Sequence, residues 1–168
     1  LRPRRFGKSL FTSVLENYYD IKKKDKFKEL FKGTYIVENP TLEKNSYYIL
    51  KFNFSGLITE NAESLLKSFH DTCIKSYDKF LNTYNLNIEY DKTGYPSDVF
   101  NKFLNEVSFN ISGPIYIIID EYDHFANELL SFKTDLFSSL VSKTGFIRKW
   151  YEVLKIGTES IVQRIFAT

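Results

Sequence analysis

The sequence is short of several residue types, and each shortage excludes a class of protein. Its 168 residues include one cysteine, four prolines and seven glycines. A single cysteine cannot form an internal disulfide, which excludes a disulfide-stabilised scaffold and favours a reducing, cytoplasmic location. The low glycine and proline content excludes a collagen-like chain, and a hydrophobic content of 43% excludes a disordered one.

Long hydrophobic runs and an excess of one charge are also lacking. The longest apolar run, Ile115–Ile119, has the length of a strand and falls far short of the roughly 20 residues that span a bilayer. We therefore expect no membrane partner. The 23 basic and 21 acidic residues give a net charge of +2, so bulk charge indicates no polyanionic partner.

Methionine is absent altogether. Translation starts at methionine, so a chain that begins Leu1-Arg2-Pro3 and contains none is expected to be part of a longer protein. We expect both ends to be cuts within a domain.

Arginine is scarce, with 5 residues against 18 lysines, but three of the five lie at the start of the chain. These are Arg2, Arg4 and Arg5. The planar guanidinium suits phosphate and carboxylate groups. The N-terminal segment is therefore a candidate binding site.

The spacing of apolar residues predicts strands that alternate with helices. Helical periodicity favours helices over residues 8–19, 60–84 and 99–109, a short helix near 27–31, and interrupted helical segments between 125 and 155. Ser97-Asp98 is expected to cap the third of these. Strands are predicted over 47–54, 115–119 and 161–168. Because residues 115–119 are all apolar, they should be buried on both faces, which predicts an α/β fold with a parallel sheet.

The first motif is Arg2-Pro3-Arg4-Arg5-Phe6-Gly7-Lys8-Ser9. It matches the end of the phosphate-loop pattern G-x-x-x-x-G-K-[ST], with Arg2 in place of the first glycine. Gly7 would let the backbone approach a phosphate, Lys8 would place its charge on the terminal phosphates, and Ser9 would offer its hydroxyl to Mg²⁺. The helix that follows adds N–H donors and a partial positive charge at its N-terminus.

The second motif is Asp120-Glu121, directly after the apolar run. Open α/β sheets bind ligands at the carboxyl ends of their strands. There Asp120 would hold Mg²⁺ through water, and Glu121 would orient and deprotonate an attacking water. Either motif alone has an ordinary structural explanation, but both in this order favour a nucleotide site.

Three segments carry a resemblance to a known family: Arg2 to Leu10, Ile119-Asp120-Glu121-Tyr122-Asp123, and Arg164-Ile165-Phe166-Ala167-Thr168. Together they resemble the AAA-ATPase-like family, whose members often carry a PD-(D/E)XK nuclease-like domain further along the chain. The resemblance implies ATP and Mg²⁺ as cofactors. It also implies nucleic acid as a partner of the nuclease-like domain, and a homo-oligomer as a further expectation.

The same resemblance implies a P-loop NTPase fold, a three-layer α/β/α sandwich with the ASCE strand order 5-1-4-3-2. On that map residues 47–54, 115–119 and 161–168 are strands 2, 3 and 4, and strands 1 and 5 are missing. The chain is thus expected to be a partial domain that retains strands 4-3-2. Thr168, at the end of strand 4, becomes the candidate sensor of the γ-phosphate or of the attacking water.

The predicted site residues fall into three groups. The catalytic candidates are Glu121, Lys8 and Thr168, and the metal candidates are Ser9 and Asp120. The predicted nucleotide-binding set is Arg4, Arg5, Phe6, Gly7, Lys8, Ser9 and Leu10. Weaker candidates at the same edge are Asn53, Ser55 and Asp123, for which capping or polar strand ends are competing explanations. His124 follows the carboxylate motif, but a lone histidine without a second His or a Cys at metal spacing is poor evidence for a metal ligand.

Three functions stay open at the level of sequence. The first is Mg²⁺-dependent ATP binding and hydrolysis that drives or gates an attached nuclease-like or other module. The second is a nucleotide-dependent switch with slow or no hydrolysis. The third is a nucleic-acid-binding module, to which the run Lys22-Lys23-Lys24 could contribute, although a solvated surface explains that run as well.

Overall fold

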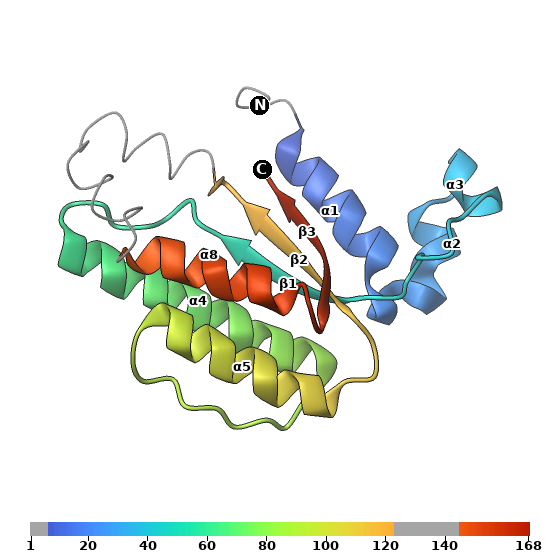
Figure 1. Ribbon diagram of the computed structural model, residues 1–168. Coiled ribbons are helices and arrows are strands. Elements are labelled where there is room, and N and C mark those ends of the chain that lie inside the picture. The colour runs from blue at the N-terminus through green and yellow to red at the C-terminus, as the bar shows by residue number, and fades with distance from the viewer. Residues whose placement is uncertain (1–6, 123–144) are drawn as a thin grey trace.

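Three parallel strands form the sheet that organises the chain (Figure 1). The computed structural model describes residues 7–122 and 145–168. Its strands are β1 (Tyr48–Asn53), β2 (Ile115–Asp120) and β3 (Val162–Ala167). They lie in the order β1-β2-β3, and both neighbouring pairs are parallel. The predicted α/β fold with a parallel sheet is confirmed, whereas the full five-strand order stays a prediction.

Helices cover both faces of the sheet (Figure 1). One face packs against α1 (Lys8–Tyr19), through Leu15 and Tyr19. The other face packs against α4 (Ala62–Tyr84), α5 (Pro96–Asn110) and α8 (Phe146–Gly157). Side chains alternate along β2 between these two layers, and every residue of β2 is buried. The prediction that the apolar run is buried on both faces is therefore confirmed.

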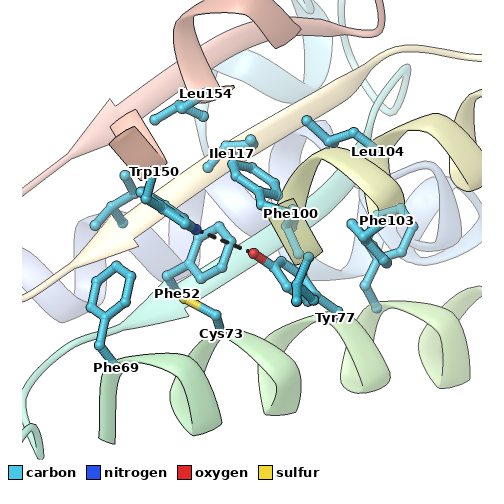
Figure 2. Close-up of a cluster of buried hydrophobic side chains, with 14 of the residues drawn as sticks. Phe52, Phe69, Cys73, Tyr77, Phe100, Phe103, Leu104, Ile117, Trp150 and Leu154 are labelled. Atoms are coloured by element: carbon cyan, nitrogen blue, oxygen red, sulfur yellow. Dashed lines mark hydrogen bonds between the residues drawn. The ribbon is translucent and has the colours of Figure 1, made fainter. Parts of the chain in front are cut away.

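An aromatic core joins α4, α5 and α8 to the sheet (Figure 2). Trp150 stacks on Phe100 at 4.9 Å between ring centroids and meets Phe52 edge-to-face at 5.0 Å. Its indole Nε1–H donates to the Tyr77 hydroxyl, with a donor–acceptor distance of 3.2 Å. Aromatic residues at helical spacing thus serve the core, as their periodicity predicts. None of the described helices combines the length and apolar character needed to cross a bilayer.

Three short helical segments follow α1. They are the 3₁₀ helix η1 (Ile21–Lys26), α2 (Phe27–Leu30) and α3 (Tyr35–Glu38). Phe27 and Phe31 are buried against the ring of Tyr18, at centroid distances of 5.7 Å each. In Figure 1 these segments extend away from the rest of the molecule at the C-terminal end of α1. The short helix near residues 27–31 was predicted, but η1 and α3 were not.

A buried carboxylate connects α1, α4 and β1. Asp20, the cap of η1, accepts hydrogen bonds from the Lys22 N–H at 2.9 Å and from the Tyr84 hydroxyl at 3.0 Å. The Tyr84 oxygen in turn accepts the Ile49 N–H at 2.7 Å. Burial raises the pKa of Asp20 above its ordinary value. The end of the first helix is thereby fixed to an edge of the sheet.

The start of α5 differs from the prediction. The helix begins at Pro96, with Tyr95 as its N-cap, so Ser97 and Asp98 lie inside the first turn. Proline is favoured at the first helical position because its fixed φ suits the helix and its missing N–H needs no partner there. The helical segments predicted between 125 and 144 lie outside the described residues.

Candidate nucleotide site

The candidate site lies at the carboxyl ends of the three parallel strands. The register pairs Asn53 with Asp120 and Ile119 with Ala167. Asp120, Glu121 and Thr168 therefore come to the same edge of the sheet, as the sequence predicts. In Figure 1 the N-terminus of α1 lies at this same end.

Asp120 is the buried acid of the site, with a relative exposure of 4%. Its Oδ1 accepts the Glu121 N–H at 3.1 Å and the Thr168 hydroxyl at 3.3 Å. Both bonds use the same oxygen, and Oδ2 makes none with the described residues. A carboxylate held in this way suits a hard cation such as Mg²⁺.

Thr168 is fixed to the end of β2 through its backbone as well. Its N–H donates to the Ile119 carbonyl at 3.0 Å, and its carbonyl accepts the Tyr122 N–H at 2.8 Å. The backbone and the hydroxyl of Thr168 thus bracket the Asp120-Glu121 pair. The residue predicted as a sensor lies in direct contact with the carboxylate predicted to serve the metal.

Glu121 has a left-handed backbone, with φ of +61°. This conformation costs a residue with a Cβ roughly 1–2 kcal/mol. The hydrogen bonds of the Glu121 and Tyr122 N–H groups, to Asp120 Oδ1 and to the Thr168 carbonyl, hold the turn in place. Strain of this kind concentrates at functional sites.

Gly7 supplies the left-handed residue that caps α1, with φ of +79°. Its carbonyl accepts the Phe11 N–H at 2.9 Å, which closes the first turn. Lys8 is half-buried, and Ser9 and Leu10 are exposed. The Phe11 ring packs edge-to-face on Phe166 at 5.4 Å. This contact places the first turn of α1 beside the end of β3, two residues before Thr168.

Of the other predicted site residues, some lie outside the described part of the chain and Asn53 has a local structural role. Arg4, Arg5 and Phe6 lie outside the described residues, as do Asp123 and His124. Asn53 is exposed and its Oδ1 accepts the Ser55 N–H at 2.9 Å, so its side chain forms a local turn. No pattern in the sequence indicates the Phe11–Phe166 contact or the left-handed Glu121.

The residues present suit a magnesium–nucleotide complex. Among the described residues no group of three His, Cys, Asp or Glu side chains could enclose a metal ion. Mg²⁺ in phosphate-binding sites needs no such group, because one or two protein oxygens, phosphate oxygens and waters complete its shell. Asp120 and the Ser9 hydroxyl would be the protein ligands, directly or through water.

A parallel α/β sheet, a Gly-Lys-Ser helix start and the buried Asp120 at the carboxyl edge of the sheet are compatible with a P-loop-like fold. The model of one family, AAA-ATPase-like and described as a predicted AAA-ATPase, matches residues 1–168, so the chain belongs to that family. The comparisons with curated proteins and with solved structures gave no match.

Proposed function

We propose that this chain binds ATP with Mg²⁺ and hydrolyses it. The observation that supports this most is the contact between Asp120, Glu121 and Thr168 at the strand ends, beside the first turn of α1. Family membership supports nucleotide binding in general. The roles of the individual residues and the hydrolysis step are our own inference.

The start of α1 would hold the phosphates. The backbone around Gly7 and the Lys8 ammonium would bind the phosphate oxygens, with the backbone N–H groups of the first helical turn as further donors. Arg4 and Arg5 would add charge to the same group, and Phe6 and Leu10 would flank it. Bound Mg²⁺ would neutralise charge on the β- and γ-phosphates.

The strand ends would carry out the chemistry. Glu121 would act as the general base and accept a proton from the attacking water. General-base catalysis of this kind typically raises the rate by roughly 10²- to 10⁴-fold. The Thr168 hydroxyl, which donates to Asp120, would be close enough to respond to the γ-phosphate or the attacking water. Lys8 would stabilise the charge that develops on the phosphate oxygens.

In the whole protein we propose that turnover drives or gates an attached nuclease-like or other module. We also propose that the chain is part of a larger P-loop domain in which a further strand pairs with β3. Among the described residues β3 pairs with β2 on one edge only, which leaves its other edge open to such a strand.

The binding part of the proposal is tested with Lys8→Ala in the full-length protein. Removal of a charge-assisted hydrogen bond costs roughly 1.5–3 kcal/mol, so the Kd for Mg²⁺-ATP should rise about tenfold or more. Isothermal titration calorimetry measures it. Lys67→Ala, which removes an exposed lysine from α4, is the matched control and should bind as the wild type does. Unchanged affinity in Lys8→Ala would overturn the assignment of the phosphate loop.

Glu121→Gln tests the hydrolysis step in the same protein. ATP affinity should be retained while single-turnover hydrolysis falls about 10²-fold or more, because the amide cannot accept the proton. Equal loss of binding and hydrolysis would show that Glu121 is structural. Wild-type protein that binds ATP but shows no turnover would favour the switch.

A further inference from the structure

A second charged surface lies at the far end of α1, over residues 22–32. This segment, called the basic arm below, contains six lysines and only two acidic residues, Asp25 and Glu29. Its net charge is +4, whereas the whole chain carries +2. The rest of the chain is therefore net negative, although residues 2–8 also carry +4 through Arg2, Arg4, Arg5 and Lys8. The basic arm is thus one of two segments in which positive charge is concentrated.

The basic arm is an ordered scaffold. Residues 21–30 form η1 and α2, and the Asp20 side chain caps η1 through the Lys22 N–H at 2.9 Å. Phe27 and Phe31 anchor the arm to Tyr18 and are only 3% and 9% exposed. With the aromatic side chains turned inward, five lysines stand exposed on the outside: Lys22, Lys24, Lys26, Lys28 and Lys32.

The charge of these five lysines is not neutralised locally. Within residues 7–122 and 145–168, none of them forms an ion pair, whereas Lys51, Lys92 and Lys102 each pair with a carboxylate. Helix α4 gives a useful contrast: its three lysines are balanced by Glu63, Asp71 and Asp78. Exposed lysines alone do not distinguish the basic arm, but an excess of lysines over acids, six against two, does.

We propose that the basic arm binds the phosphodiester backbone of nucleic acid. Lysines are compact point charges that suit phosphate oxygens, and contacts to phosphate carry no sequence information. The arm contains no arginine, so binding should depend little on sequence. Insertion into an anionic membrane is disfavoured because that mode needs an outward apolar face. Of the three large apolar side chains in the arm, Phe27 and Phe31 are buried and Leu30 alone is exposed.

The basic arm and the nucleotide site are separate. Helix α1 has 12 residues and is therefore about 18 Å long. The nucleotide site lies at its N-terminus and the basic arm begins just past its C-terminus (Figure 1). Removal of charge from the arm should leave ATP binding unchanged.

The test compares two triple variants of the full-length protein. Lys24→Ala/Lys28→Ala/Lys32→Ala removes three charges from the basic arm, and Lys67→Ala/Lys75→Ala/Lys79→Ala removes three exposed charges from α4. Fluorescence anisotropy measures binding to a labelled DNA duplex and to an RNA duplex between about 50 and 200 mM salt. In the arm variant the slope of log K against log salt should shrink by about 0.9 for each phosphate that no longer meets a lysine, or about 2.7 for all three. At low salt its affinity should fall at least tenfold.

Three controls make the outcome decisive. The arm variant should keep the thermal midpoint and the ATP affinity of the wild type, which excludes misfolding. Equal decreases in both triple variants, or no binding by the wild type at the lowest salt concentration, would overturn the proposal. So would an arm variant that keeps its nucleic-acid affinity and no longer binds vesicles with anionic lipid, because the membrane would then be the partner. A failure of Lys8→Ala to affect ATP binding would leave this test unaffected.

Discussion

Glu121 combines a candidate catalytic carboxylate with a left-handed backbone conformation. Its left-handed backbone turns the chain at the end of β2, and the hydrogen bonds to Asp120 Oδ1 and the Thr168 carbonyl hold that turn. Glutamate is a poor choice for this conformation on steric grounds, where glycine would fit without strain. The choice of glutamate is therefore explained by its side chain and not by stability.

Glu121→Gly should make the protein more stable and inactive. Relief of the left-handed strain, roughly 1–2 kcal/mol, exceeds the extra backbone entropy of glycine in the unfolded chain, roughly 0.5–1 kcal/mol. The free energy of unfolding should rise by about 0.5–1 kcal/mol, as measured by urea denaturation. Glu121→Ala is the matched control, since it removes the same carboxylate and keeps a Cβ. Equal stability of the two variants would contradict the strain argument.

The placement of the candidate residues at one edge of the sheet was predictable, whereas their contacts were not. The strand-end rule brings Asp120, Glu121 and Thr168 to one edge from sequence alone. The hydrogen bond between Thr168 and Asp120 also depends on the register of β3. That register shifts near Ile115, which pairs with Val162 while Tyr116 pairs with Arg164. A bulge of one residue cannot be predicted from an apolar pattern, because the pattern gives no information about pairing.

At the scale of elements, α4 and α8 are joined by a polar contact inside an apolar core. Trp150 and Tyr77 are both fully buried, and the Tyr77 hydroxyl gives the Trp150 N–H a hydrogen-bond acceptor inside the core. Burial raises the pKa of the Tyr77 phenol well above its ordinary value, so the hydroxyl stays protonated. The contact is thus independent of pH across the physiological range.

Tyr77→Phe should destabilise the protein by about 1–3 kcal/mol, because the Trp150 N–H would be left without its acceptor. Urea denaturation followed by tryptophan emission measures this directly, since Trp150 is the single tryptophan. Tyr95→Phe removes a hydroxyl from a side chain that is 60% exposed and should change stability by less than about 0.5 kcal/mol. Equal effects of the two substitutions would show that the buried hydrogen bond contributes nothing.

Elements with a clear apolar pattern were predicted well, whereas two of the three short helical segments after α1 were not. The helix over 8–19 has the predicted bounds, and the strands and α4 agree to within a few residues. Their apolar patterns repeat often enough to define a face. The segments η1 and α3 have six and four residues and no such repetition, and their positions depend on tertiary contacts such as that between Tyr18 and Phe31.

At the scale of the whole molecule, Asp20 connects parts that are distant in sequence. The carboxylate binds η1 and α4, and Tyr84 extends the connection to β1. Burial raises the pKa of Asp20 above its ordinary value near 3.8. The folded state therefore binds the Asp20 proton more tightly than the unfolded state does. As pH rises from about 3.8 through the raised pKa of Asp20, this group lowers the free energy of unfolding.

Asp20→Asn should remove this pH dependence while it keeps an oxygen for both hydrogen bonds. As pH rises from about 4 through the raised pKa, the wild type should lose stability relative to the variant. Thermal midpoints of the two proteins at steps between about pH 4 and 7 measure the difference. A constant difference across that range would show that Asp20 does not titrate in the folded protein near these values.

The Tyr84 hydroxyl also affects how readily the protein associates with other copies of itself. It occupies the outer edge of β1 and accepts the Ile49 N–H, the position where a carbonyl of an added strand would bind. An exposed sheet edge recruits strands from other chains and so promotes aggregation. A phenol held by Asp20 blocks that recruitment at one point of β1, so association through this edge would first have to displace Tyr84 from the core.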